Sequence, residues 1–160
     1  MWNTSDLYDQ FEGKVQTNQA PLAHYGGNRA FCGVLDTVEC FEDNVLLRQA
    51  LEEEGKGRVL VAQGHGSRAC ALMGDMIASV GMNNGWSGVV INGMIRDVGA
   101  ISKLDWGVMA LGSNPAKSRK LGIGARNKAI RFGGVYFEPG AYIYCDEDGI
   151  LVGSQKLHNL

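Results

Sequence analysis

Three charged residues in the middle of the chain have types and a spacing that could do chemistry together: Asp75, Arg96 and Asp97. A guanidinium such as that of Arg96 can hold a carboxylate or a keto oxygen through a fork of hydrogen bonds. A lone carboxylate such as Asp97 suits a hard cation that keeps most of its waters, as Mg²⁺ does. Asp75 adds a second carboxylate for proton transfer. These residue types predict a site for a small anion and a divalent cation.

Short apolar strands and helical segments alternate around these residues. Strands are predicted over residues 58–62, 88–91 and 107–111, and helical segments over 68–84 and 98–104. This alternation is typical of right-handed crossovers in a parallel sheet. Ligands collect beyond the carboxyl ends of such strands. We therefore expect the loop over residues 92–97 to bring Arg96 and Asp97 close to Asp75 in one cleft.

The segment that carries Asp75 offers a second means of holding an anion. Gly74-Asp75 interrupts the helical pattern of residues 68–84. A helix that restarts there presents free N–H groups and the positive end of its dipole. A Gly-Asp pair at a helix start is, however, commonly just a cap. An Arg-Asp pair in a loop is commonly solvated, so the residues alone support an α/β domain with an acidic and arginine-containing anion site.

The glycine turn after the first strand, Gly64-His65-Gly66-Ser67, fits none of the familiar nucleotide or nucleophile motifs. It lacks the Lys-Ser/Thr of a P-loop and the full GxGxxG of a dinucleotide site. The sequence supports no Ser/Cys–His–Asp arrangement around His65. The role of His65 stays open at this point.

The flanking parts of the chain complete a two-part architecture. A short helix is predicted from Thr4-Ser5-Asp6, an irregular stretch over 14–30, a strand over 31–41, a helix over 44–54, and short strands over 130–137, 141–145 and 150–152. Turn sequences separate the last strands. The sequence predicts a parallel β/α portion with a β-rich layer folded against it, in a single domain over residues 1–160.

Composition narrows the classes of partner. The chain has 45% hydrophobic and 20% charged residues and a net charge of −2, and its basic residues are scattered. Binding to nucleic acid through charge is therefore not expected. The start of the chain lacks a signal-peptide pattern, and no apolar run approaches the ~18 residues of a membrane span. The four cysteines lack metal-ligand spacing, so we expect reduced thiols in a cytoplasmic protein without membrane contact.

The spacing of Gly74-Asp75, twenty intervening residues and then Arg96-Asp97 matches the G-D-x20-R-D signature of one lyase family. The chain resembles the 4-hydroxy-4-methyl-2-oxoglutarate aldolases, which share their fold with the regulator of ribonuclease E activity A. The similarity covers nearly the whole chain. It includes Thr4-Ser5-Asp6-Leu7, Phe31-Cys32-Gly33, Asn84-Gly85-Trp86, Phe132-Gly133-Gly134-Val135 and Asp146-Glu147-Asp148-Gly149-Ile150.

This resemblance implies a three-layer β/β/α swivelling-domain fold and a ring-shaped homotrimer with active sites between subunits. It implies a class II aldolase that uses Mg²⁺ or Mn²⁺, cleaves 4-hydroxy-2-oxo acids to pyruvate and decarboxylates oxaloacetate. Carried over by position, the substrate contacts are Gly74, Asp75, Met76, Ile77 and Arg96, the catalytic residues are Asp75 and Arg96, and the metal ligand is Asp97.

The resemblance also carries alternatives. The chain could be a non-catalytic regulator that binds and inhibits ribonuclease E. The enterobacterial regulator resembles this family but lacks the Asp at position 97, so the presence of both Asp75 and Asp97 favours catalysis. A methyltransferase role is disfavoured because the Gly-rich strand–turn–helix of a dinucleotide-like cofactor site is absent. Basic residues further along could line an entrance for dianionic substrates or form a solvated loop: Lys117, Arg119, Lys120 and Arg126.

Overall fold

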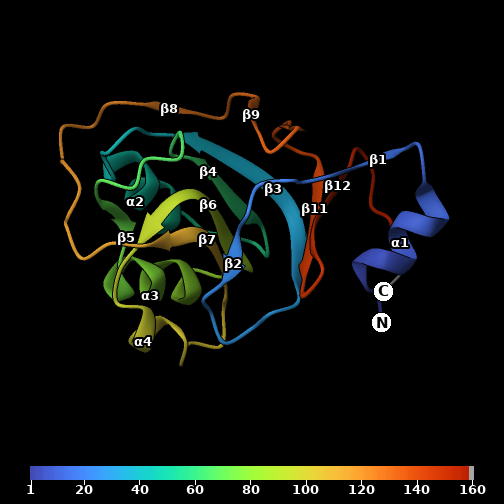
Figure 1. Ribbon diagram of the computed structural model, residues 1–160, viewed down its shortest axis with the longest axis horizontal. Helices are drawn as coiled ribbons and strands as arrows, with labels where there is room; N and C mark the ends of the chain where they lie inside the picture. Colours follow the sequence, from blue (N-terminus) through green and yellow to red (C-terminus); the bar gives the residue numbers. More distant parts are fainter. Residues whose placement is uncertain (159–160) are drawn as a thin grey trace.

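The computed structural model describes residues 1–158 and is built around one large mixed sheet (Figure 1). Along the sheet the strands run in the order β1-β12-β11-β3-β4-β6-β7-β2, with β5 on β6 and β8 on β3. The strands are β1 (Val15–Thr17), β2 (Ala23–His24), β3 (Phe31–Glu39), β4 (Val59–Gln63), β5 (Ala71–Met73), β6 (Gly88–Ile95), β7 (Gly107–Ser113), β8 (Ala125–Arg126), β9 (Ile130–Phe132), β10 (Val135–Phe137), β11 (Tyr142–Asp146) and β12 (Gly149–Gly153). The helices are α1 (Thr4–Phe11), α2 (Val45–Glu52), α3 (Asp75–Asn83) and α4 (Val98–Ile101).

Strand β3 belongs to both parts of the sheet. Its first half pairs with β11 in the antiparallel sense, with Gly33 opposite Ile143. Its second half pairs with β4 in the parallel sense, with Thr37 opposite Val61. The strand therefore joins the antiparallel portion near the chain ends to the parallel portion in the middle.

The parallel strands are apolar on both faces, as expected for strands covered on both sides. Along β4, Val59 and Val61 face one hydrophobic core while Leu60 and Ala62 face the other. Helices α2, α3 and α4 cover the second face, with Trp106 in the same core.

The other face carries strands from the end of the chain. In this core, β4 packs against β9, β10, β11 and β12, where Phe132 and Phe137 stack with ring centroids 4.7 Å apart. The parallel part of the sheet is the middle layer. The helices cover one face of it, and the antiparallel end of the same sheet, together with the β9–β10 hairpin, covers the other face. These three layers confirm the predicted β/β/α class.

The structure corrects several predicted elements. Residues 71–73, predicted as helix, form β5, and β6 continues to Ile95 through most of the predicted loop. The stretch over 14–30 contains β1 and β2, and residues 130–137 form a hairpin rather than one strand. Helix α4 ends at Ile101, and α1 is capped by Asn3, whose side chain accepts the N–H of Asp6. For the strands among these elements, pairing with a neighbouring segment decides the local conformation, which propensity alone does not reveal.

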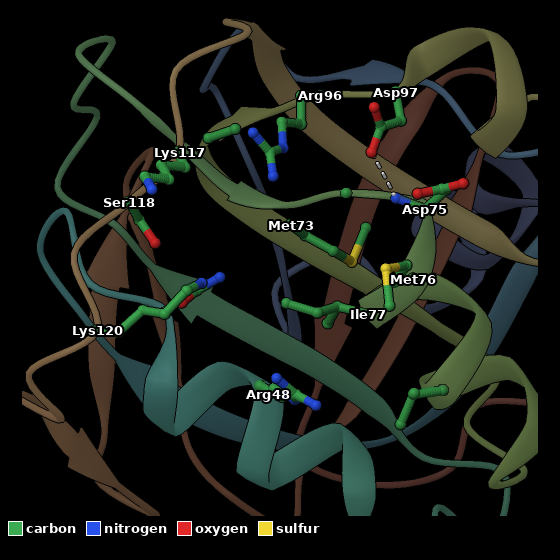
Figure 2. A pocket seen from close by; sticks show the side chains of 14 residues that line it. Arg48, Met73, Asp75, Met76, Ile77, Arg96, Asp97, Lys117, Ser118 and Lys120 are labelled. Atoms are coloured by element: carbon green, nitrogen blue, oxygen red, sulfur yellow. Dashed lines mark hydrogen bonds between the residues drawn. The ribbon is translucent and has the colours of Figure 1, made fainter.

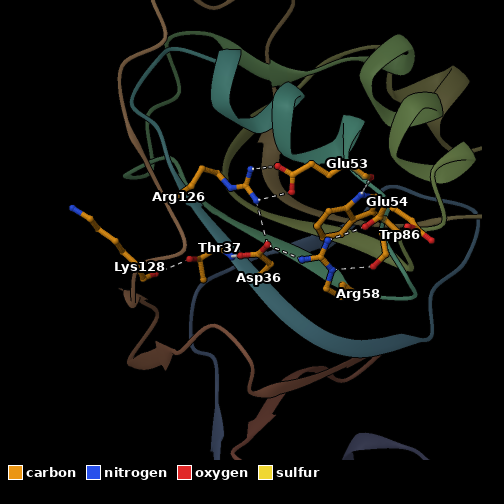
Figure 3. A network of polar contacts seen from close by, with 9 residues as sticks. Asp36, Thr37, Glu53, Glu54, Arg58, Trp86, Arg126 and Lys128 are labelled. Atoms are coloured by element: carbon orange, nitrogen blue, oxygen red, sulfur yellow. Dashed lines mark hydrogen bonds and ion pairs between the residues drawn. The ribbon is translucent and has the colours of Figure 1, made fainter.

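A closed polar network lies near the amino end of β4 (Figure 3). The buried carboxylate of Asp36 accepts hydrogen bonds from Arg58 at 2.9 Å and Arg126 at 3.2 Å. Arg126 also donates to Glu53 at 3.0 Å, and Arg58 lies 4.5 Å from the ring centroid of Trp86. The network joins β3, β4, α2 and β8, so its charges hold elements together.

Within residues 1–158, no helix combines the length and apolar character needed to cross a membrane. The four cysteines are free thiols. Burial raises the pKa of Cys40 to about 12, with the negative charge of Asp43 adding to the effect. Cys40 is therefore a packing residue in the core under the helices.

Candidate functional site

The element that brings the predicted site together is the short strand β5. Its pairing with the extension of β6 sets Met73 opposite Ile95 in the parallel sense. The backbone N–H of Arg96 then donates to the carbonyl of Met73 at 2.9 Å. The segments that follow the two strands, Gly74-Asp75 and Arg96-Asp97, consequently lie side by side.

Close contact between these segments explains the glycine. A Cβ atom at position 74 would collide with Oδ2 of Asp97 and contact Cγ of Arg96. Only glycine leaves room for the Asp97 carboxylate at this place. Oδ2 of Asp97 accepts the backbone N–H of Asp75 at 3.1 Å, across the start of α3.

Asp97 has an unusual backbone conformation. Its φ and ψ angles, 60° and 39°, lie in the left-handed region, which non-glycine residues other than Asn and Asp rarely adopt. It is the N-cap residue of α4 without using its side chain as a cap. The left-handed turn frees the carboxylate from its own helix and directs it to α3.

Helix α3 begins at the site. Its N-cap is Gly74, which has no side chain to bond the first-turn N–H groups. The N–H of Asp75 is taken by Asp97, and Met76 and Ile77 follow in the same turn. First-turn N–H groups have no partner within the helix, so this end of α3 suits an anion.

A pocket of about 210 Å³ lies over these segments (Figure 2). All six residues predicted from the sequence line it: Gly74, Asp75, Met76, Ile77, Arg96 and Asp97. Residues that sequence reasoning did not assign to it also line the wall, among them Arg48, Met73 and Ser118. Lys117 and Lys120 line it as well.

Arg96 enters the pocket with much of its hydrogen-bonding capacity free. Its side chain is exposed, and one guanidinium nitrogen donates to the carbonyl of Pro115 at 3.3 Å. Among residues 1–158 no carboxylate lies within ion-pair distance of it. A guanidinium held at its edge and open elsewhere can receive a carboxylate or keto oxygen.

The far wall of the pocket is a segment that we call the strap, residues 114–123. It is tied to β5 by the N–H of Ala71, which donates to the carbonyl of Ala116 at 2.8 Å. It is tied to the β3–α2 loop by the N–H of Arg119, which donates to the carbonyl of Glu42 at 2.8 Å. These bonds set Lys117, Ser118 and Lys120 along the pocket.

The buried side chain of Asp43 holds the strap in place through hydrogen bonds. Its carboxylate is 1% exposed and accepts the N–H groups of Val45 at 3.1 Å, Leu121 at 2.7 Å and Gly122 at 3.0 Å. Burial works to raise the pKa of Asp43, but the backbone hydrogen bonds outweigh it and hold the pKa below the ordinary value. Asp43 is ionised at neutral pH and connects the start of α2 to the strap.

The fit of a divalent cation can be tested on the donor set. Within the part of the chain that the structure describes, no three His, Cys, Asp or Glu side chains gather as a ligand group. The described residues of one chain therefore do not form a site that would hold a cation mainly through protein side chains. A Mg²⁺-like ion that keeps most of its waters needs only one or two carboxylates. Asp97 is exposed at the pocket and fits that limited role.

His65 lies outside this arrangement. Its Nε2 is 3.2 Å from Oε2 of Glu39, and its ring is edge-on to Phe41. With φ at 55°, it occupies the glycine turn in the left-handed region. It does not line the pocket. The turn leads into β5 rather than into a helix, so the strand–turn–helix of a dinucleotide-like site is not formed after β4.

Comparison with known proteins shows the family of this chain. The family description "RraA-like: Aldolase/RraA" matches residues 4–152. The chain belongs to the RraA-like family. A relative from Aromatoleum aromaticum is 49% identical over 156 residues, covering 98% of each chain, and its provisional name is 4-hydroxy-4-methyl-2-oxoglutarate aldolase.

Two solved structures of similar proteins carry other names. One from Geobacillus kaustophilus is described as an S-adenosylmethionine: 2-dimethylmenaquinone methyltransferase. It is 48% identical with a TM-score of 0.96, covering 99% of this chain and 100% of that one. The other, the RNA-processing inhibitor RraA from Thermus thermophilis, is 35% identical with a TM-score of 0.95, covering 100% and 97%. The RraA-like fold is thus shared by proteins with three different names.

Proposed function

We propose that this RraA-like protein is a divalent-metal-dependent carbon–carbon lyase. It would cleave 4-hydroxy-4-methyl-2-oxoglutarate and related 4-hydroxy-2-oxo acids to pyruvate, and decarboxylate oxaloacetate. The observation that carries the proposal is the meeting of three groups in one small pocket: Arg96, which makes no ion pair within residues 1–158, the carboxylate of Asp97, and the first turn of α3.

Both reactions break the bond between C3 and C4 of a 2-oxo acid and leave its electron pair on the pyruvyl part as an enolate. In the aldol cleavage the C4 hydroxyl loses its proton and becomes a carbonyl. In decarboxylation the C4 carboxylate leaves as CO₂. The enolate then takes a proton at C3 to give pyruvate. The shared demand is stabilisation of negative charge that develops on the keto oxygen.

The residues of the pocket can meet this demand. Arg96 would hold the pyruvyl carboxylate or keto oxygen through its guanidinium. The N–H groups of Met76 and Ile77 would face the same anion. Asp75 would move the proton between substrate and solvent as a general base or acid. A cation held by Asp97 would supply positive charge next to the keto oxygen.

We further propose that a neighbouring copy completes the pocket in a homotrimer. Arg96 and Asp97 are exposed, and large apolar side chains near the pocket are exposed as well: Met76 at 79%, Leu121 at 68% and Ile123 at 63%. Such side chains commonly mark an interface. Light scattering coupled to size exclusion gives the mass, and a monomer at assay concentration would contradict the trimer.

The deciding experiment is pyruvate formation from both substrates by the wild-type protein and by Asp97→Asn. Asn tolerates the left-handed backbone and its carbonyl can still accept the Asp75 N–H, so the fold is kept while the charge is lost. We expect turnover to need Mg²⁺ or Mn²⁺, to stop with a chelator and to return when metal is added. We expect Asp97→Asn to be slower by at least about 100-fold.

The matched control is Asp105→Asn, which removes an exposed carboxylate that does not line the pocket. It should keep wild-type turnover. If Asp97→Asn kept its metal-dependent activity, Asp97 would not be the metal ligand. If the wild type turned over neither substrate with any divalent metal, the lyase assignment would be wrong.

The likeness to the Thermus inhibitor favours a second candidate, the binding and inhibition of ribonuclease E. This role needs a surface and no metal ligand. A pull-down with ribonuclease E and an RNA-cleavage assay would test it, with Asp97→Asn as the discriminating variant. Inhibition that persists in an inactive Asp97→Asn protein would show that the two roles use different surfaces.

A further inference from the structure

The pocket has a second cationic end across from Arg96. Figure 2 shows Arg96 and Asp97 on one side, and Arg48 from α2 and Lys120 from the strap on the other. Apolar side chains of Met73 and Ile77 lie between the two sides. A ligand that spans the pocket would therefore meet a cation at each end and an apolar middle.

The basic residues near this end fall into two groups. Arg119 pairs with Glu42 at 3.4 Å, and Arg126 pairs with Glu53 and Asp36 in the closed network of Figure 3. Neither of these arginines lines the pocket. Because they lie outside its lining, they do not offer an anion site to a ligand held in the pocket.

Lys120 and Arg48 differ from that group. Among the described residues Lys120 makes no ion pair, and the acid within reach of Arg48 is Glu52 on the same helix at 4.0 Å. A contact of that length between two side chains that are at least half exposed contributes almost nothing. Both cations are thus available to a ligand.

The fold holds these two cations in place relative to each other. Asp43 bonds the N–H of Val45 at the start of α2 and the N–H groups of Leu121 and Gly122 in the strap. Arg48 is one turn along α2 from Val45, and Lys120 directly precedes Leu121. One buried carboxylate therefore anchors the backbone on both sides of the cationic end.

We propose that Arg48 and Lys120 bind the second carboxylate of a dicarboxylic 2-oxo acid, and so select dianionic over monoanionic substrates. The proposal rests on the proposed function for the other end of the ligand, where Arg96 takes the 2-oxo acid group. In an aldol substrate the distal carboxylate stays on the fragment that leaves. The pair Arg48 and Lys120 thus binds a part of the substrate that does not react, and sets specificity.

Calorimetric binding of two stable acids tests this without turnover. 2-Oxoglutarate and 2-oxopentanoate have the same chain length and the same 2-oxo acid end, but a carboxylate and a methyl group at C5. Titrations use the wild-type protein with Mg²⁺, then Arg48→Met/Lys120→Met, each single variant, and Arg119→Met as the matched control. Methionine keeps an aliphatic side chain and removes the charge.

We expect the wild type to bind 2-oxoglutarate about 10- to 100-fold more tightly than 2-oxopentanoate, the range for one or two charge-assisted hydrogen bonds. In Arg48→Met/Lys120→Met this ratio should fall to within about 3-fold of one, with the affinity for 2-oxopentanoate unchanged. Arg119→Met should keep the wild-type ratio. A wild type with no preference, or a preference kept by the double variant, would overturn the proposal.

The outcome is separable from that of the lyase assay. A preference for the dianion that is lost in the double variant, in a protein without lyase turnover, supports the subsite and removes the proposed reaction. Lyase turnover without any preference for the dianion removes the subsite and leaves the reaction. Equal loss of both acids in the double variant would assign Arg48 and Lys120 to the general shape of the pocket and contradict a distal carboxylate site.

Discussion

The central sheet carries two clusters of aspartate and arginine that behave in opposite ways. Near the amino end of β4, Arg58 and Arg126 donate hydrogen bonds to Asp36, and Arg126 also donates to Glu53, so each charge has a partner of opposite sign. Beyond the carboxyl end of β6, Arg96 and Asp97 are adjacent in sequence but are not paired with each other. The same residue types thus hold secondary-structure elements together at one end of the sheet and line an open pocket at the other.

The difference shows what separates a structural charge from one that is free to act. In the closed network the side chain of Asp36 is 8% exposed, and hydrogen bonds compensate for its loss of water. The hydrogen bond from Arg126 lowers the pKa of Glu53, which keeps that carboxylate charged. At the pocket, exposure to water stabilises the charges of Arg96 and Asp97 until a ligand arrives. Pairing within the fold, rather than residue type, distinguishes the two clusters.

Replacing arginine by lysine at each cluster should give the largest difference between the two, because one variant should lose activity and the other should lose stability. Arg96→Lys keeps the charge but loses the fork, so we expect lyase activity to fall about 100-fold with the midpoint of thermal unfolding nearly unchanged. The kinetic constants and a melting curve measure both. Arg58→Lys is the matched variant, and it should lower the melting temperature without a comparable loss of activity. Normal turnover by Arg96→Lys would make Arg96 a structural residue.

Breaking the closed network should cost stability instead. Asp36→Asn leaves Arg58 and Arg126 without their shared carboxylate, and we expect a loss of about 2–3 kcal/mol in the free energy of unfolding. This estimate is below that for a fully buried pair because the side chains of Arg58 and Arg126 are 27% and 18% exposed. Chemical denaturation gives the value. A variant with wild-type stability would show that the network contributes no net stability.

A smaller, pH-dependent effect is expected at Asp43, which joins the fold to the pocket wall. Because hydrogen bonding lowers its pKa in the folded protein, its contribution to stability is present above the ordinary aspartate pKa of about 3.9. That contribution is lost as the pH falls through the lowered value. Asp43→Asn should cost about 1–2 kcal/mol at pH 7 and flatten the decline in stability below about pH 4. Unfolding midpoints measured between pH 3 and pH 7 test this, and parallel curves for both proteins would contradict it.

The sequence predicted those parts of the fold that depend on local apolar runs. The strands over 58–62, 88–91 and 107–111 are confirmed, as is the β/β/α class. It also predicted that Asp75, Arg96 and Asp97 would share a cleft, and the pocket contains all three. Their catalytic roles, the metal and the trimer stay predictions that the proposed experiments test.

Other features could not be predicted because they depend on contacts between distant segments. Ala71-Leu72-Met73 has good helix-forming residues, yet pairing with β6 and the strap makes it a strand. In the sequence, Arg48 looks like an ordinary exposed residue of an amphipathic helix. Only the structure shows that it lines the same pocket as the strap. Asp43 precedes Asn44, the N-cap position of α2, and looks like part of a cap, although its main partners lie almost eighty residues away. No local pattern in the sequence carries these relations.

The left-handed backbone of Asp97 has a consequence for how such proteins diverge. At this φ angle asparagine is, glycine aside, the least strained replacement for aspartate, and the codons of the two residues differ by a single base. One nucleotide change can therefore remove the carboxylate from the pocket and leave the helix start, the sheet and the surface as they were. A fold built in this way can lose its chemistry in one step and be retained for its surface alone, which offers a physical route to a family whose members carry such different names.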